Sequence, residues 1–387
     1  MLAIGMDVHS SKTTAYAVPL QESDMDVCAI AEDFNKSFKN FYSDRHGYAK
    51  VASFLEGIDH CILIENSTKS HDVYWMLTNL GYHVVVAHAT DLYRITKSTK
   101  KNDDNDAKEL AGYMRRRLNG EDEFRESFIP DAEWSKKRAL CRFLANQKNE
   151  LARTKQQVRA YLLLNGQYFM DGFSNVSSNE AMRRFTDTKE MIPKLLAESM
   201  NRNKKLIKFT EDVIRQEFYN NRMFDILISI PGVGLHTAAY LTAEIVDIGR
   251  FQTKEGFSSY FGVRPSQRDS ADSLKNGHIS HRGDDLARRL CFQATFVHIF
   301  HCPESPIAEK YNRLMSKGKH HRVAVVACEN SMFMMIFSMI RNNRCYESDP
   351  QTLAKARAMA DSLDLCEDDE DDALTLELMK TRNKEAA

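Results

Sequence analysis

The sequence predicts an α/β domain at its N-terminus, followed by a mainly helical part with two long polar helices. Short apolar runs, typical of buried strands, alternate with segments of helical periodicity, and this alternation ends near Pro130. Beyond Pro130, charged residues recur with helical spacing over stretches too long for strands. A chain of 387 residues is long enough for two or three domains of ordinary size.

The N-terminal elements follow one another at short intervals. The first apolar run, residues 2–8, reads as a buried strand that pairs with residues 13–20 across a turn. Strands and helices alternate after it: a helix over 48–55, a strand over 61–64, a helix over 72–80, a strand over 82–87 and a helix over 103–118. This order indicates a largely parallel sheet with an antiparallel first hairpin.

The middle of the chain consists of two long helical patterns, over residues 133–164 and 191–218, with a loop between them. They predict a helical hairpin or coiled coil. The first is one-sidedly basic, which favours a nucleic-acid or dimer surface over a solvated spacer. The basic residues that we assign to this nucleic-acid surface are Arg138, Arg142, Lys148, Arg153, Lys155 and Arg159.

A third region begins near residue 224, where an apolar helix end leads into the turn Pro-Gly-Val-Gly and a further helix. The backbone N–H groups of Gly232 and Gly234 could bind a phosphate, as in a helix-hairpin-helix turn, or the turn is a plain connection between helices. A loop rich in Ser, Lys, Arg and Gly follows over residues 264–283, and two more helices come after it. We therefore expect a mainly α C-terminal domain.

Composition excludes several classes of protein. The net charge is −1, but residues 367–372 form a solid acidic block, so the rest of the chain is net basic. The eight cysteines are scattered without CxxC spacing, which argues against a zinc site or a disulfide framework. The sequence has neither a long charge-free apolar run nor a signal peptide at its start. We expect a cytoplasmic, nucleoid-associated protein that does not bind membranes.

Four carboxylates occupy positions where active sites form. Asp7 lies at the end of the first strand, Glu65 directly follows the strand Cys-Ile-Leu-Ile, and Asp103 and Asp106 share one face at the start of a helix. Four clustered acids would repel one another unless they bind a divalent cation, and oxygen ligands suit Mg²⁺ or Mn²⁺. The alternative for each acid alone is a surface charge or, for Asp103, a helix N-cap.

The N-terminal motifs resemble those of the IS110 insertion-sequence transposases, which are related to the Piv-type DNA invertases. The matching pieces are IGMDVHSSK around Asp7, ILIEN around Glu65 and KNDDNDAKELA around Asp103 and Asp106. The resemblance implies an RNase H-like, or RuvC-like, α/β domain. It also implies that these four acids form the Asp-Glu-Asp-Asp metal tetrad of the family.

The C-terminal motifs resemble the second domain of the same family, through IPGVG at 230–234 and the run from 261 to 290. Ser270 occupies the position of the family's nucleophilic serine, with Ala271 in place of the usual glycine and His281 in place of the common lysine. Ser266 and Ser273 lie close by, and a polar loop serine is the alternative reading of Ser270. The basic residues that flank Ser270 and could hold a phosphate are Arg264, Arg268, Lys275 and Arg282.

The resemblance also implies an activity and partners. Ser270 of one subunit would act with the tetrad of another, so that a dimer or tetramer cuts and rejoins donor and target DNA through a covalent phosphoserine. A structured bridge RNA would pair with both DNAs and carry the sequence specificity. Two alternatives remain: a RuvC-like nuclease that uses water, such as a Holliday-junction resolvase, and a non-catalytic nucleic-acid scaffold.

The expected segments are as follows: a RuvC-like nuclease domain over 1–128, a helical hairpin or coiled-coil insertion over 129–222, a C-terminal transposase domain with a helix-hairpin-helix-like turn and the serine loop over 223–345, and a flexible acidic tail over 346–387.

Overall fold

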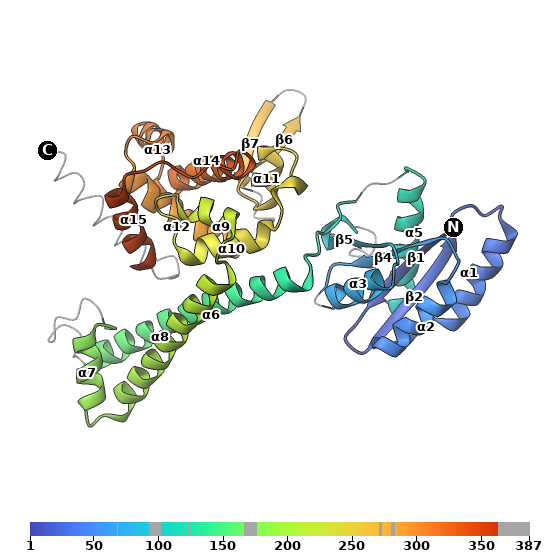
Figure 1. The fold of residues 1–387 in the computed structure, drawn as a ribbon, viewed down its shortest axis with the longest axis horizontal. Helices are drawn as coiled ribbons and strands as arrows, with labels where there is room; N and C mark the ends of the chain where they lie inside the picture. Colours follow the sequence, from blue (N-terminus) through green and yellow to red (C-terminus); the bar gives the residue numbers. More distant parts are fainter. Residues whose placement is uncertain are drawn as a thin grey trace. The chain divides into compact units, whose positions relative to one another are not determined.

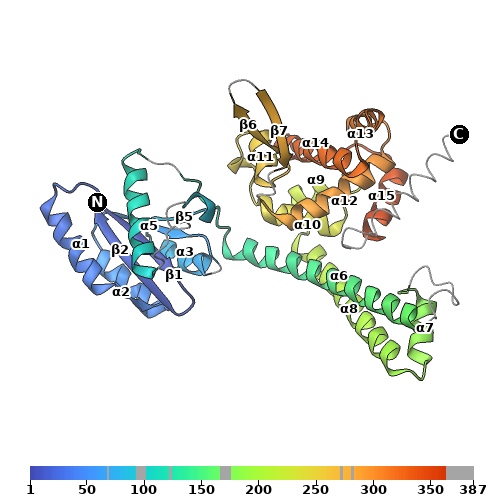
Figure 2. The same cartoon turned by 180° about the vertical axis from the view of Figure 1, so that it is seen from behind.

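The chain forms two compact units, each with its own hydrophobic cores, in a computed structural model (Figures 1 and 2). The first unit covers Met1–Asp131, and the second begins at Ala132. The structure describes residues 1–67, 69–92, 102–121, 124–165, 176–270, 273–279 and 283–362.

The first unit is built on a five-stranded mixed sheet with the strand order β3-β2-β1-β4-β5. Strand β1 pairs antiparallel with β2 and parallel with β4, and β4 pairs parallel with β5. The antiparallel first hairpin is confirmed, and β1, β4 and β5 form the predicted parallel part, but the antiparallel pairing of β2 with β3 makes the sheet mixed instead of largely parallel. The strands are β1 (Leu2–Val8), β2 (Lys12–Pro19), β3 (Phe41–Tyr42), β4 (His60–Glu65) and β5 (Val84–Ala87).

The two faces of this sheet are covered by different helices, because side chains alternate along each strand. Ile4 and Met6 of β1 pack in the core beneath α1, α2 and α3, whereas Ala3 packs with Leu110 and Met114 of α5 on the opposite face. The helices are α1 (Met25–Ser37), α2 (Arg45–Leu55), α3 (Ser70–Asn79) and α5 (Asp103–Leu118).

The second unit starts with the long helix α6 (Ala132–Leu164), which packs against α8 (Met191–Glu217) as the predicted helical hairpin (Figure 1). The short helix α7 (Asn179–Asp187) covers one end of the pair, where Leu162, Phe185 and Met200 share a small core. At the other end, Cys141 and Ile214 join the core of the C-terminal helices. The hairpin and the C-terminal region therefore belong to one unit, although the sequence predicted separate segments.

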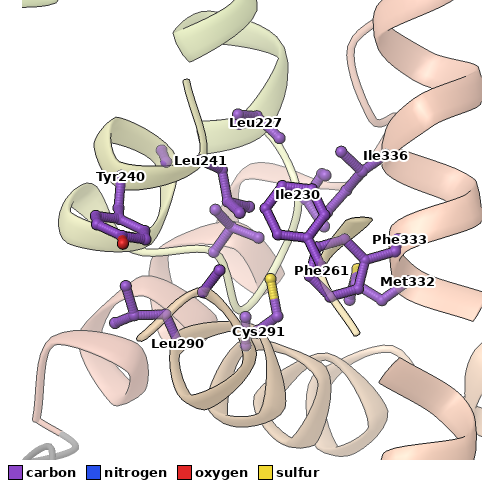
Figure 3. Packing of buried hydrophobic residues seen from close by; sticks show 14 of the residues in the cluster. Leu227, Ile230, Tyr240, Leu241, Phe261, Leu290, Cys291, Met332, Phe333 and Ile336 are labelled. Atoms are coloured by element: carbon purple, nitrogen blue, oxygen red, sulfur yellow. The ribbon is translucent and has the colours of Figure 1, made fainter. Parts of the chain in front are cut away.

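The C-terminal helices pack around one large apolar core (Figure 3). Phe261 stacks on Phe333 with ring centroids 4.6 Å apart, and Ile230 and Cys291 are fully buried in the same cluster. The helices are α9 (Arg222–Ile228), α10 (Leu235–Ile245), α11 (Lys254–Tyr260), α12 (Asp285–His301), α13 (Pro306–Ser316), α14 (His321–Arg341) and α15 (Pro350–Ser362).

Two sequence expectations about this unit are wrong. The segment 264–283, expected to be a loop, contains two paired strands, β6 (Pro265–Ser270) and β7 (Ser273–Ile279). The expected tail from residue 346 begins with helix α15, because Ala356 is buried and Arg357 donates a hydrogen bond to the carbonyl of Ile228. The acidic block itself lies outside the described residues.

Helix α14 is the one described helix that is long and apolar enough, by length and composition, to cross a membrane. Its residues Cys328, Met332, Phe333 and Ile336 are fully buried in the core of the second unit. The same apolar composition is therefore required for packing within the protein.

Glu329 on α14 is a buried acid within this core. Its side chain is 2% exposed, and its Oε1 has no hydrogen-bond partner among the described residues. Burial raises the pKa of Glu329 to about 8, although the nearby Arg288 opposes the shift. The carboxyl is therefore neutral in the folded protein at pH 7, because ionisation without a partner is costly.

We predict that Glu329→Gln stabilises the protein at alkaline pH and has little effect near pH 4. In the unfolded chain this carboxyl ionises from its ordinary pKa of 4.5 upward, while the folded protein holds the proton until about pH 8, so the wild type loses stability across that window. The glutamine cannot ionise, and its advantage should grow to a few kcal/mol, since each pKa unit is worth about 1.4 kcal/mol.

The measurement is the unfolding temperature of both full-length proteins from pH 4 to pH 9. Glu347→Gln, at an exposed glutamate of the same unit, is the matched control and should show no such trend. A Glu329→Gln difference that stays constant with pH would contradict the prediction.

Candidate active site

Strand alternation places the predicted acids on the face of the sheet that α5 covers. In β1, Ala3 faces α5. Asp7 lies on the same side of the sheet, because an even number of residue steps separates it from Ala3 along the strand. In β4, Leu63 packs in the core under α5, which places Glu65 on that face as well. Because Met6 pairs with Ile64 in parallel register, Asp7 and Glu65 occupy neighbouring positions at the carboxyl ends of adjacent strands.

Gly5 allows helix α5 to approach β1 closely. A Cβ atom at this position would lie 2.3 Å from the backbone oxygen of Ala107 and 2.3 Å from the backbone nitrogen of Ala111. Both contacts are with helix backbone, which cannot move aside as a flexible side chain would. The absence of a side chain at Gly5 therefore fixes the position of the whole helix, including its acidic first turn.

The first turn of α5 presents its acids toward the carboxyl end of β1. The N-cap is Asn102, whose side chain accepts a hydrogen bond from the backbone N–H of Asn105. The alternative reading of Asp103 as the N-cap is therefore wrong, and Asp103 lies inside the helix. Acidic residues in a first turn are favoured by the helix dipole, and Asp104 also pairs with Lys39 at 2.7 Å.

A histidine joins the acids at this point. The Nε2 atom of His9 lies 3.2 Å from Oδ2 of Asp7 and 3.5 Å from Oδ1 of Asp103. The Asp7 side chain is 15% exposed, whereas those of His9 and Asp103 are more than half exposed. The group therefore lies at the surface with one half-buried carboxylate beneath it. His9 was not among the site residues predicted from the sequence, although its spacing of two residues from Asp7 was a usable signal.

The electrostatics of the group favour a bound cation. Burial raises the pKa of the Asp7 carboxyl, the charges of Asp103 and Asp106 raise it further, and His9 lowers it. Burial is the largest cause of the raised pKa, and the smaller contributions of Asp103 and Asp106 reflect repulsion between ionised carboxylates. A divalent cation would remove this repulsion.

The donor atoms fit a metal ion. Asp7, His9 and Asp103 each offer one ligand atom, and these three atoms all lie within 4.8 Å of one another. Asp106 is close enough to affect the pKa of Asp7, and Glu65 lies at the neighbouring strand position. The structure thus brings Asp7 and Asp103 together directly, with Asp106 and Glu65 on the same edge.

The predicted serine lies on the second unit. Ser270 is the last residue of β6 and pairs with Ser273 of β7, so it lies at the turn end of the hairpin. Arg264 immediately precedes this hairpin. Arg268 of β6 and Lys275 of β7 lie opposite each other in the backbone pairing of the two strands. Arg282 and the side chains on the two strands lie outside the described part of the structure.

A partly exposed polar network surrounds Asp284, the N-cap of α12, which is the first helix after the hairpin. Its Oδ1 accepts from the N–H of Ala287, while Oδ2 accepts from the Tyr240 hydroxyl at 2.6 Å and pairs with Arg142 at 2.6 Å. Arg142 also bonds to Glu244 at 3.0 Å. The network joins α6, α10 and the start of α12, and so holds the segment from which the hairpin extends.

Among the predicted nucleic-acid residues on α6, those nearest the start of the helix contact other elements of the protein. Arg138 donates to the backbone carbonyls of Ala243 and Glu244, Arg142 belongs to the Asp284 network, and Lys148 pairs with Glu211 at 3.1 Å. These contacts tie α6 to α10 and α8. Arg153, Lys155 and Arg159 lie farther along α6, where Arg153 is exposed.

The Pro-Gly-Val-Gly turn is buried, which favours the plain helix connection over the predicted phosphate site. Gly232 has a positive φ of 95°, and a Cβ there would lie 2.3 Å from the carbonyl oxygen of Ala294. Gly234 is also buried, and Val233 is fully buried. The absence of a side chain at Gly232 allows the turn to pack against α12, which gives this glycine a packing role.

Comparisons with known proteins agree on one class of protein. A transposase family model of the Asp-Glu-Asp-Asp type matches residues 4–166, and the model of the transposase IS116/IS110/IS902 family matches residues 224–312. The first unit is thus a transposase-type domain, for which an RNase H-like fold is expected, and the mixed five-stranded sheet is compatible with it. Together the two matches span more than half of the chain, which belongs to the IS110 family of transposases.

Individual relatives give the same assignment. The chain is 27% identical to an insertion element IS110 protein of Streptomyces coelicolor, over 51% of this chain and 47% of that protein. It is 28% identical to an insertion element IS900 protein of Mycobacterium paratuberculosis, over 38% of this chain and 36% of that protein. It is also 27% identical to the pilin gene-inverting protein of Moraxella bovis, over 33% of this chain and 39% of that protein. The matched part thus spans about half or less of each relative.

We predict that Gly5→Ala displaces α5 and impairs the metal site. The added methyl group cannot fit against the helix backbone, and overpacking of this kind costs about 1–3 kcal/mol of stability. The unfolding temperature should fall, and Mn²⁺ binding, measured by titration, should weaken.

Gly112→Ala, within α5 itself, is the control. Its added Cβ would meet only the flexible Arg116 side chain at 3.3 Å, so stability should be unchanged or slightly higher. A Gly5→Ala protein that binds Mn²⁺ as the wild type does would show that this contact does not position the acids.

Proposed function

We propose that this protein is a DNA transposase or site-specific recombinase that depends on a divalent metal ion. The observation that carries the proposal is the convergence of Asp7 and Asp103 at one edge of the sheet, each within 3.5 Å of His9. Membership of the IS110 family supports the same activity. The insertion-element and gene-inverting relatives indicate DNA as the substrate.

Each acid has a defined part in this proposal. Asp7 and Asp103 would hold the metal ion directly, and Glu65 from the neighbouring strand and Asp106 from the same first turn of α5 would complete the tetrad. A bound Mg²⁺ or Mn²⁺ would neutralise phosphate charge and orient the scissile phosphodiester. The fixed sheet and helix hold the acids in place before DNA binds, so little reorganisation is needed during the reaction.

Ser270 is our proposed nucleophile. Its hydroxyl oxygen forms a bond to phosphorus, its proton is lost, and the bond to the leaving DNA oxygen breaks, which frees a DNA hydroxyl. The phosphoserine keeps the energy of the phosphodiester, so that a hydroxyl of the partner strand can reverse the reaction and rejoin the DNA. Its place at the turn end of the β6–β7 hairpin supports this role, because a projecting hairpin can reach a DNA backbone.

The proposal includes several partners. Donor and target DNA are the substrates, and a structured bridge RNA would supply the base pairing that selects them. A homodimer or tetramer would allow the tetrad of one subunit to act with Ser270 of another. We place the protein in the cytoplasm with the nucleoid, where its DNA substrates are found.

One alternative differs in a single chemical step. A RuvC-like nuclease with the same acids would use water in place of Ser270 and would release cut DNA without a protein-linked intermediate. A non-catalytic scaffold would show no metal dependence at all. The hairpin favours the recombinase. A covalent intermediate would identify the recombinase, and metal-dependent cleavage would separate the nuclease from the scaffold.

We predict that Ser270→Ala eliminates both recombination and the covalent protein–DNA adduct, because no other group would hold the cut phosphate. Ser266→Ala and Ser273→Ala are the matched controls on the same hairpin, and their adducts should form at near wild-type levels. The measurement is adduct formation on labelled DNA, resolved on a denaturing gel, with recombinant product scored in parallel.

Asp7→Asn should also abolish the adduct while the protein stays folded, since the amide binds a divalent cation poorly. An adduct in the Ser270→Ala protein would show that another residue is the nucleophile. Cleavage without any adduct in the wild type would favour the water-using nuclease. Metal-independent activity, or full cleavage by Asp7→Asn, would contradict the metal site.

We predict that the far part of α6 binds nucleic acid through Arg153, Lys155 and Arg159. Replacing all three by Gln should weaken binding and reduce the slope of log K against log salt by about 0.9 for each lost phosphate contact on duplex DNA. The measurement is fluorescence anisotropy with labelled DNA and RNA from 50 to 300 mM salt. Arg215→Gln on α8 is the control, and an unchanged slope in the triple variant would argue against this surface.

A further inference from the structure

His9 lies among the acids but does not belong to the tetrad. It directly follows β1, in the turn to β2, where its backbone N–H donates to the carbonyl of Lys12 at 3.0 Å. This bond fixes the backbone at the point where the chain leaves the sheet. Because residues two apart in an extended segment share a side, the imidazole extends over the same edge as Asp7.

The distances around His9 match those between ligands of one metal ion. Its Nε2 atom is 3.2 Å from Oδ2 of Asp7 and 3.5 Å from Oδ1 of Asp103. With metal–ligand bonds of about 2.0–2.1 Å, neighbouring ligands lie roughly 2.8–3.0 Å apart in octahedral geometry and roughly 3.3–3.4 Å apart in tetrahedral geometry. The two nitrogen–oxygen distances are therefore close to the spacing that a small divalent ion needs, and all three ligand atoms lie within 4.8 Å of one another.

We propose that His9 is a nitrogen ligand of the metal ion held by Asp7 and Asp103, and that it makes this site prefer transition-metal ions over Mg²⁺. The inference rests on the metal site of the proposed function. An imidazole nitrogen binds first-row transition metals well, whereas Mg²⁺ takes oxygen ligands. A site made of carboxylates alone would lack this preference.

The competing explanation gives His9 a role without a metal. The imidazole can form a hydrogen bond to one carboxylate and an ion pair with the other, which stabilises two like charges against each other. In that case the side chain leaves or turns away when an ion binds, and no nitrogen contacts the metal. The two explanations predict different spectra for a bound paramagnetic ion.

The experiment uses Mn²⁺ alone as the probe and the full-length protein freed of metal. Electron spin-echo envelope modulation detects a nitrogen bonded to Mn²⁺, and electron paramagnetic resonance of free Mn²⁺ gives the affinity. The wild type should show nitrogen modulation. His9→Ala should lose it and bind Mn²⁺ about tenfold more weakly or worse, since changes even in the outer sphere of a metal site cost about that much.

Two further variants make the result specific. His9→Asp supplies an oxygen in place of the nitrogen, so it should also lose the modulation while competition by Mg²⁺ becomes stronger. His46→Ala, at an exposed histidine of α2, is the matched control and should behave as the wild type. The His9 side chain is 52% exposed, so its removal leaves no hole in a core, and circular dichroism will verify folding.

The outcomes separate this inference from the proposed function. If the wild type shows no nitrogen modulation, or if His9→Ala keeps both modulation and affinity, His9 is not a ligand. If Asp7→Asn then still abolishes Mn²⁺ binding, the metal site stands without His9. If the wild type binds neither Mn²⁺ nor Mg²⁺, both this inference and the metal-dependent function are wrong.

Discussion

Helix α5 lies so close to strand β1 that only a hydrogen atom fits between them at Gly5. This contact is the geometric constraint on which the candidate active site depends. The strand supplies Asp7 at its carboxyl end, and the helix supplies Asp103 and Asp106 in its first turn. Because a helix and a sheet are both stiff, fixing their closest approach also fixes the acids one or two turns away. Packing in the core thus determines electrostatics at the surface.

Nearby positive groups offset the electrostatic repulsion between these acids. The N-terminus of α5 favours negative charge, Lys39 pairs with Asp104, and His9 lies between Asp7 and Asp103. The serine hairpin, by contrast, belongs to the second unit, where Asp284 ties its neighbouring helix to α6 and α10. Each half of the proposed chemistry is therefore built on its own core.

Much of the first unit was predictable from local patterns. Alternation of apolar runs and helical periods identified β1, β2, β4, β5, α2, α3 and α5, because each period reflects burial of one face of a single element. The same logic placed Asp7, Glu65, Asp103 and Asp106 at one edge. It missed α1, the two-residue strand β3 and the β6–β7 pair. Strands β6 and β7 are rich in polar residues, so they carry no clear apolar period.

The order of most elements of the first unit, the acidic edge and the family motifs could be predicted from the sequence, since these depend on residues close together along the chain. Which charges have partners depends on the tertiary structure. Arg142 and Asp284 are 142 residues apart in sequence and 2.6 Å apart in space, and no local pattern contains that pairing. The same is true of Gly232, which packs against α12, and of His9, whose contact with Asp103 exists only because α5 folds back onto β1. Contacts between distant segments depend on the packing of whole elements, which the local period of a sequence does not record.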